Sequence, residues 1–194
     1  MKTKLGTLLV ASLLFLMNCS GPSTFINKEA DWTFYKKIGL LPFVNLSPDR
    51  FAGEKVQSAF VTELYLSSKF DVVEPGEFNA RVAEVLKATG AQITQDLSAE
   101  LIKAIGEKAG VQGIIAGTVR EFTTVRIGQT DYPLISLSVR LIDVPTGTVV
   151  WMTSHTEKGG PNMPIISIGE THTLGELTQK ISHDIVSQFI GKAF

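Results

Sequence analysis

Three histidines are the side chains in this chain best suited to bind a transition metal or to carry a proton near neutral pH. They are His155, His172 and His183, and their spacing does not match the two histidines, four residues apart, of a helical zinc site. His155 and His172 flank a long connection and would meet only if that connection folded back. The favoured interpretation of each is a solvated or locally hydrogen-bonded side chain, so we expect no bound metal.

Nucleophilic and acid–base catalysis also lack a recognisable pattern. The sequence has no Gly-x-Ser-x-Gly elbow, and its one cysteine, Cys19, lies in the leader. Carboxylates such as Asp31 and Asp49 are scattered, with no spacing that pairs them. The glycines Gly113 and Gly117 match neither a phosphate-binding loop nor a dinucleotide fingerprint, and close packing of a strand explains them better. We therefore predict that the protein is not an enzyme and binds no cofactor.

Cys19 has a different chemistry available, which is lipidation. Lys2 and Lys4 precede an apolar run over residues 8–17, the order of a signal peptide. The run is too short to span a membrane as a helix. Residues 16–20, Leu-Met-Asn-Cys-Ser, resemble a bacterial lipobox, although Met and Asn are unusual before the cysteine. The resemblance implies that Cys19 is acylated and becomes the mature N-terminus. The alternative is an ordinary secretory leader with an incidental cysteine.

The leader also predicts the organisation and destination of the mature chain. Residues 1–18 form the signal peptide, residues 19–36 a lipid-anchored tether, and residues 37–194 one α/β domain. Ser20 replaces the aspartate that typically retains Gram-negative lipoproteins at the inner membrane, which implies an outer-membrane anchor facing the periplasm. Loss of Lys2 and Lys4 lowers the 18 Lys+Arg to 16, against 19 Asp+Glu, a net charge of −3. That charge, without a basic cluster, excludes a nucleic-acid partner.

The elements that position these residues centre on three strands, predicted over residues 113–125, 134–143 and 148–155. The middle one has the clearest alternation in the sequence, because apolar side chains at Ile135, Leu137, Val139 and Leu141 alternate with polar ones. After it, Pro145 excludes the tightest hairpin turns and favours a type I turn with Gly147 in the left-handed region. This turn would place Leu141 opposite Trp151 and Asp143 opposite Val149, with Trp151 in the core.

The rest of the domain alternates short strands with amphipathic helices. Strands are predicted over residues 37–44 and 70–73, and helices after residue 49, from Pro75 to Gly90, and over residues 97–108. A capping-box pattern from Thr173 to Glu176 begins the last helix. The predicted fold class is α/β with two or three layers. A mixed sheet ends in an antiparallel three-strand meander, and about four amphipathic helices pack on it.

Four segments resemble a group of bacterial envelope domains that includes the curli-secretion lipoprotein CsgG, the N-terminal domain of TolB and the penicillin-binding-protein activator LpoB. They are Ile38-Gly39-Leu40-Leu41-Pro42-Phe43-Val44-Asn45, Phe70-Asp71-Val72-Val73-Glu74, the glycine-bounded strand at residues 110–119, and the turn region at residues 139–151. Together they span roughly residues 37–155. The resemblance implies a non-catalytic domain that binds other envelope proteins in the periplasm.

Neither long connection predicts a membrane-spanning hairpin of the kind that CsgG subunits insert. Residues 126–132 are few and have little apolar content. Residues 157–172 contain Gly159, Gly160, Pro161 and Pro164, which are poor strand formers, and this segment is predicted to be a loop. That loop is either functional or a simple connector.

Exposed apolar side chains are the remaining candidates for partner contacts. Met163, Ile165 and Ile166 lie in the long loop, and Trp32 and Phe34 precede the first predicted strand. Each group either packs onto the domain or contacts another envelope protein or a second copy of the chain. The sequence predicts a lipid-anchored periplasmic adaptor or assembly component in envelope biogenesis or secretion. The alternative is an LpoB-like activator of a cell-wall synthase, against which the short tether, about 60 Å at full extension, argues.

Overall fold

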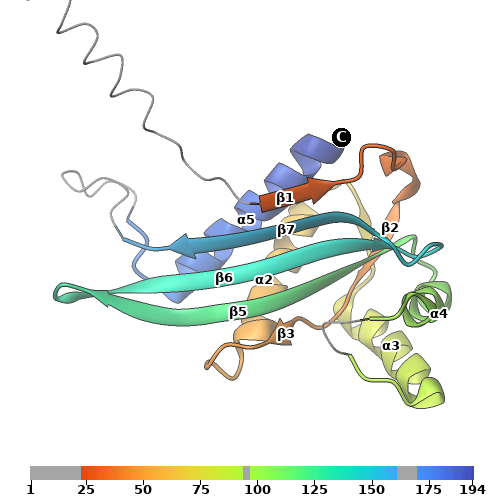
Figure 1. Cartoon of the computed structure of the whole chain (residues 1–194), viewed down its shortest axis with the longest axis horizontal. Coiled ribbons are helices and arrows are strands. Elements are labelled where there is room, and N and C mark those ends of the chain that lie inside the picture. Colours follow the sequence, from red (N-terminus) through yellow and green to blue (C-terminus); the bar gives the residue numbers. More distant parts are fainter. Residues whose placement is uncertain (1–22, 94–96, 161–169) are drawn as a thin grey trace, which may run out of the picture.

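The protein is described by a computed structural model that covers residues 23–93, 97–160 and 170–194 (Figure 1). The strands are β1 (Ser23–Ile26), β2 (Lys37–Leu40), β3 (Val44–Asn45), β4 (Asp71–Val72), β5 (Gly113–Ile127), β6 (Thr130–Asp143) and β7 (Val149–Lys158). The helices are the 3-10 turn η1 (Trp32–Phe34) and the α-helices α2 (Ala52–Ser67), α3 (Pro75–Thr89), α4 (Ala99–Ala109) and α5 (Leu174–Ala193).

One mixed sheet of seven strands organises these elements. The strand order is β1-β7-β6-β5-β2-β4, and β3 pairs with β5 beyond the end of β2. The pairs among β2, β3, β4 and β5 are parallel, whereas β5, β6, β7 and β1 run antiparallel to their neighbours. The predicted fold class, a mixed sheet that ends in a meander and carries four α-helices, is confirmed.

The helix ends follow local sequence signals. Pro75 occupies the first turn of α3, and Gly90 ends that helix in the left-handed conformation. Gly110 ends α4 in the same way. At α5, the Thr173 side chain accepts a hydrogen bond from the Glu176 amide and the Glu176 side chain accepts one from the Thr173 amide, which is the predicted capping box.

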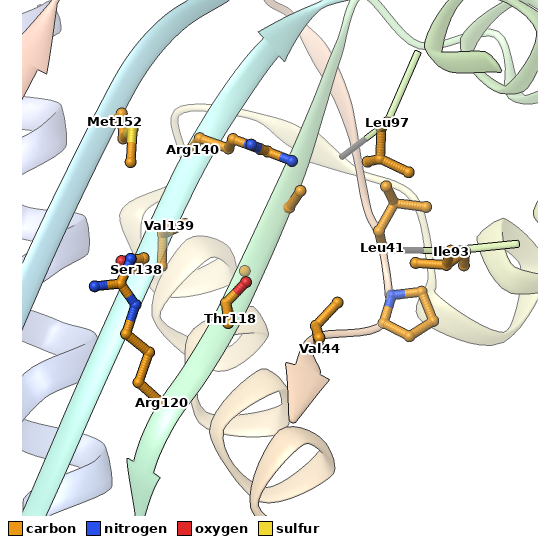
Figure 2. A pocket seen from close by; sticks show the side chains of 13 residues that line it. Leu41, Val44, Ile93, Leu97, Thr118, Arg120, Ser138, Val139, Arg140 and Met152 are labelled. Carbon is orange, nitrogen blue, oxygen red and sulfur yellow. The ribbon is translucent and has the colours of Figure 1, made fainter. Parts of the chain in front are cut away.

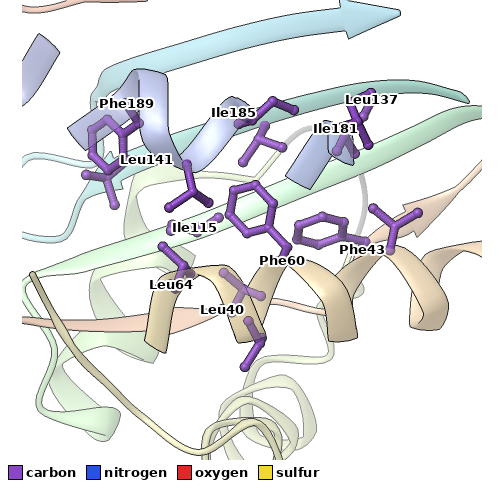
Figure 3. Close-up of a cluster of buried hydrophobic side chains, with 14 of the residues drawn as sticks. Leu40, Phe43, Phe60, Leu64, Ile115, Leu137, Leu141, Ile181, Ile185 and Phe189 are labelled. Carbon is purple, nitrogen blue, oxygen red and sulfur yellow. The ribbon is translucent and has the colours of Figure 1, made fainter. Parts of the chain in front are cut away.

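Helices α2 and α5 cover one face of the sheet and build the larger core (Figure 3). Apolar residues that alternate along β5 and β6 point into this layer, as predicted from the period of two. Trp151 on β7 is 1% exposed and stacks on Phe189 of α5, with 4.3 Å between ring centroids. The prediction that Trp151 belongs to the core is confirmed. The core residues labelled in Figure 3 are Leu40, Phe43, Phe60, Leu64, Ile115, Leu137, Leu141, Ile181, Ile185 and Phe189.

Helices α3 and α4 pack on the opposite face, but only toward one end of the sheet. Ile114 of β5 and Ile142 of β6 lie opposite each other and are buried in this second core with Phe78 and Ile105. The first β5 residue beyond Ile114 on this face, Ala116, is only partly buried. The layer is therefore short, and the sheet continues past it.

The turn between β6 and β7 differs from the predicted one by a single residue. Gly147 has the expected positive φ of 70°, and Leu141 pairs with Trp151 as predicted. The predicted pairing of Asp143 with Val149 is wrong, because a bulge after Leu141 puts Ile142 opposite Val149. The Asp143 carboxylate explains the shift, since it accepts hydrogen bonds from the amide and hydroxyl of Thr146 and closes the turn from inside.

Two further segments are strands where none was predicted. Residues 126–132 read as a link, yet β5 and β6 continue to a two-residue turn at Gly128 and Gln129. Gly128 has a φ of 64° in the first turn position, which suits a type II′ hairpin. Within the predicted tether, β1 pairs with β7 at the sheet edge. None of the described helices is long and apolar enough to cross a membrane.

Candidate functional site

Each histidine forms a local pair with a carboxylate. His155 Nε2 lies 3.0 Å from Glu157 Oε2, His172 Nε2 lies 3.0 Å from Glu170 Oε2, and His183 Nδ1 lies 2.9 Å from Glu63 Oε2. These pairs are on separate elements, and the described residues contain no group of three His, Cys, Asp or Glu side chains that would hold a metal ion. The locally hydrogen-bonded interpretation fits His155 and His172, whose partners are two residues away, whereas the partner of His183 lies on α2, 120 residues away in sequence.

Glu157 is the centre of a half-buried charged cluster between β7 and α5. Its carboxylate contacts His155 on its own strand and Lys180 on α5. The hydrogen bond from His155, followed by the contact with Lys180, lowers the pKa of Glu157 from 4.5 to about 2, against an opposing effect of burial. The cluster joins the end of the sheet to the first half of α5.

This cluster should make the free energy of unfolding depend on pH in the acidic range. A carboxyl group with a lowered pKa in the folded chain stabilises the fold above its unfolded value, and the stabilisation is lost as pH falls. We expect the free energy of unfolding to drop by roughly 1–3 kcal/mol between pH 4.5 and about 2, and Glu157→Gln to lack this part of the drop. Urea unfolding over that pH range measures it. Glu107→Gln, in an exposed ion pair with Lys103 at 4.0 Å, is the control. Equal slopes for both variants would contradict the assignment.

The glycines Gly113 and Gly117 have the packing role that the sequence predicts. A Cβ atom on Gly117 would lie 2.6 Å from three ring carbons of Phe43, and one on Gly113 would lie 2.9 Å from a methyl group of Leu141. Both distances are far shorter than a normal carbon–carbon contact. The glycines let the side chains of Phe43 and Leu141 pack closely against β5.

The predicted partner contacts fall into two groups. Trp32 is partly buried and packs edge-on against Phe189, with 5.7 Å between centroids. Phe34 is 43% exposed and touches Tyr35. The remaining predicted site residues, Cys19, Met163, Ile165 and Ile166, lie outside the described residues.

A surface that the sequence analysis did not single out is the part of the sheet beyond α3 and α4. We call it the open face, and it consists of Phe25, Ala116, Thr118, Arg120, Ser138, Arg140, Met152 and Ser154. Its residues form rows across four strands. Ala116 pairs with Arg140, Arg140 with Met152, and Met152 with Phe25. The next row runs from Thr118 through Ser138 and Ser154 to Ser23.

A pocket of about 110 Å³ lies on this face, between β5, β6 and the segments that follow β2 and α3 (Figure 2). Figure 2 shows Arg120 reaching over the sheet toward Ser138, whereas Arg140 reaches over β5 from the other side. Ser138 is 9% exposed and shares a 2.7 Å hydrogen bond with Ser154. The apolar lining residues are Leu41, Pro42, Val44, Ile93, Leu97, Ala116, Val139 and Met152.

The sequence held a signal for this surface. The polar members of the β6 alternation, which include Ser138 and Arg140, predict a face turned to solvent. The alternation does not say how far the helices reach along that face, nor that Arg120 of β5 would reach toward Ser138. That information lies in the strand register and in the lengths of the helices.

The comparisons with known proteins identify the fold and no family. No protein-family model and no curated protein matches the chain. Among solved structures, the PelC dodecamer from Paraburkholderia phytofirmans is 16% identical, with a TM-score of 0.57, over 87% of this chain and 97% of that one. Lipoprotein GNA1162 from Neisseria meningitidis is 22% identical, with a TM-score of 0.52, over 78% of this chain and 99% of that one.

The C-terminal domain of LpoB from Salmonella enterica also matches, at 14% identity and a TM-score of 0.46, over 68% of this chain and 87% of that domain. For PelC and lipoprotein GNA1162, identities this low show a likeness of fold alone. The fold found in PelC and in lipoprotein GNA1162 is thus the fold of this chain.

Proposed function

We propose that the protein is a non-catalytic lipoprotein of the bacterial envelope, anchored through Cys19 to the outer membrane and facing the periplasm. It binds other envelope proteins and acts as an adaptor or assembly component in envelope biogenesis or secretion. The observation that carries this proposal is the open face, a broad sheet surface with mixed apolar and basic character. A surface of this kind suits another protein better than a small substrate.

The chemistry of the described residues supports a binding role. The half-buried carboxylate Glu157 is engaged with His155 and Lys180, and the buried carboxylate Asp143 is engaged with Tyr35 and Thr146. A general acid or base must instead face a site where a substrate can bind. The pocket on the open face presents arginines and hydroxyls, which bind and orient a partner.

Assembly with further copies of the chain belongs to the same proposal. PelC, which shares the fold, forms a dodecamer. Phe34 offers an exposed aromatic side chain for a contact between subunits, and Met163, Ile165 and Ile166 are proposed for the same role from the sequence.

The lipid anchor has a direct test in the mass and partition of the full-length protein. We expect the native protein to carry the mass of an acylated Cys19 and to sediment with outer membranes after density separation. Cys19→Ala should carry no acyl mass and leave the membrane fraction, because one residue provides the anchor. Intact-mass spectrometry and fractionation check both. Native protein without acyl mass would refute the anchor, and its recovery with inner membranes would refute the outer-membrane destination.

A further inference from the structure

Strand β1 joins the proposed lipid anchor to the folded domain over a very short length of chain. Only Ser20, Gly21 and Pro22 lie between Cys19 and the start of β1 at Ser23. The four steps along the chain from Cys19 to Ser23 span at most about 14 Å at full extension. An acylated Cys19 would therefore keep the beginning of β1 within that distance of the bilayer surface.

The rest of the domain is fixed to β1. All four residues of the strand pair with β7. The Thr24 hydroxyl lies 3.1 Å from Thr153 Oγ1 and donates a 2.9 Å hydrogen bond to Gln188 Oε1 on α5. Ile26, at the end of the strand, packs against the larger core. The anchor thus holds the whole domain close to the membrane, because β1 is part of the sheet and does not extend the tether.

The edge that β1 forms is uncharged and partly apolar. From Cys19 to Asn27 the chain contains no charged side chain. Phe25, in the middle of β1, is 54% exposed. Ile26 on β1 and Trp32 on η1 are only partly buried where they pack against the larger core. Aromatic side chains are enriched where a membrane meets water, so this composition suits contact with a lipid surface.

We infer that the β1 edge is a membrane-contact surface, on which the domain stands against the bilayer with the Phe25 side chain in the lipid interface. The inference rests on the proposed function, because it needs the anchor at Cys19. The length of the chain selects the bilayer as the occupant of this edge, since the anchor gives β1 a high effective concentration next to lipid. The backbone at the free side of β1 stays among the headgroups, where water is available, because an open sheet edge does not enter the hydrocarbon core.

Contact at the β1 edge leaves the rest of the sheet turned toward the periplasm. Strand β1 lies at one end of the strand order and β4 at the other, so β4 is the strand farthest from the bilayer. Figure 1 shows β1 along one edge of the sheet, with β5 and β6, which carry the pocket, further in. A protein in the periplasm can then reach the pocket from the side while the anchor stays in place.

Quenching of a fluorescent label by lipids tests this contact in the full-length, acylated protein. The chain has one cysteine, and lipidation blocks its thiol, so an introduced cysteine is the only site for the thiol-reactive label NBD. The label is placed at Met152→Cys, opposite Phe25 on β7, or at Asp71→Cys, on β4 at the other edge of the sheet. The vesicles contain phosphatidylethanolamine and phosphatidylglycerol, with some lipids carrying a nitroxide near the headgroup. We expect roughly a twofold loss of fluorescence at position 152 and none at position 71, because contact with the interface reaches only about 5–10 Å into it.

Substitutions of Phe25 separate contact from mere nearness to lipid. Phe25→Glu should restore most of the fluorescence at position 152, because a charged side chain leaves the interface while the anchor stays in place. Phe25→Thr, which keeps a strand-forming residue without the apolar ring, should restore it in part and guards against detachment of β1. Phe51→Glu is the matched control, since Phe51 is 51% exposed but lies at the start of α2. It should leave the quenching unchanged.

The outcomes separate the membrane contact from the anchor on which it rests. Quenching at position 152 that persists in Phe25→Glu and Phe25→Thr would show that the short tether alone holds the label near lipid, and would overturn the contact. Equal quenching at positions 152 and 71, or none at either, in protein that carries the acyl mass would also overturn it and leave the anchor in place. Native protein without the acyl mass would refute the anchor, and this inference with it.

Discussion

Replacing Trp151 with alanine is expected to lower the free energy of unfolding by about 3–5 kcal/mol, the range for removing a large buried aromatic side chain. The indole is 1% exposed, and it stacks on Phe189 and lies opposite Leu141 in the sheet. Small domains have a total stability of about 5–15 kcal/mol, so this one change removes a large share of it. Urea unfolding, followed by circular dichroism, measures the loss.

Trp151→Phe separates the packing of the ring from the chemistry of its N–H group. The indole Nε1 is buried and has no hydrogen-bond partner among the described residues, so phenylalanine removes an uncompensated donor while it keeps an aromatic ring. We expect this variant to lose only about 1–2 kcal/mol. The inference of a core role would fail if the alanine variant lost less than about 1 kcal/mol.

Trp151 also links the core to the open face. Its chain neighbour Met152 points to the opposite side of β7 and contributes to the pocket. The stacking of Trp151 on Phe189 of α5 therefore also holds Met152 in its position on the open face. A loosened Trp151 should therefore weaken partner binding as well as stability. A change at Met152 itself should affect binding alone, because this side chain is already 37% exposed.

Much of the fold was predictable because its signals are local. Proline and glycine at the ends of α3, and the capping box of α5, fix helix ends through a few neighbouring residues. The alternation along β6 fixes which side chains face α2 and α5. These features need no knowledge of the rest of the chain.

The parts that were missed depend on partners distant in sequence. Strand β1 has only four residues, and its identity as a strand comes from pairing with β7 some 130 residues later. The extension of β5 and β6 to Gly128 likewise relies on cross-strand pairs such as Arg126 with Asp131. The open face was missed for the same reason, because its rows exist only once four strands are aligned.

The turn after β6 shows a third cause, which is a competing local interaction. Pro145 and Gly147 indicated a short turn, but Asp143 captures the Thr146 amide at 3.0 Å and the Thr146 hydroxyl at 2.6 Å. An aspartate three residues before a threonine is a signal for such a turn, and it was available in the sequence. The second partner of Asp143 is Tyr35, and no sequence signal indicated it, because it lies 108 residues away in sequence.

Asp143 is the polar residue whose loss should be most damaging. It is 7% exposed, and Tyr35 donates a 3.0 Å hydrogen bond to it in addition to the two bonds from Thr146. A buried carboxylate is tolerated only when such bonds replace water. Asp143→Ala leaves the buried hydroxyl of Tyr35 without its acceptor and opens the turn, so we expect a loss of about 2–4 kcal/mol in urea unfolding.

Two variants divide this loss between its partners. Tyr35→Phe keeps the carboxylate and the turn but removes one charge-assisted hydrogen bond, and should cost about 1–2 kcal/mol. Thr146→Ala should cost less, roughly 0.5–1 kcal/mol, because Thr146 is exposed and water replaces its hydroxyl. In the double variant Tyr35→Phe with Asp143→Ala, the two losses should add up to more than the measured total, since both remove the same bond.

Alkaline pH gives an independent readout of the same contact. Burial, and then the hydrogen bond to Asp143, raises the pKa of Tyr35 above its ordinary value of 10.0. A group whose pKa is raised by folding stabilises the fold below its unfolded pKa, and that contribution is lost as pH rises above it. The free energy of unfolding should thus decline above about pH 10 in the native protein and decline less in Tyr35→Phe. Identical declines in the two proteins would show that the phenol is not held as the structure places it, and the tie between η1 and the β6–β7 turn would then have to come from packing alone.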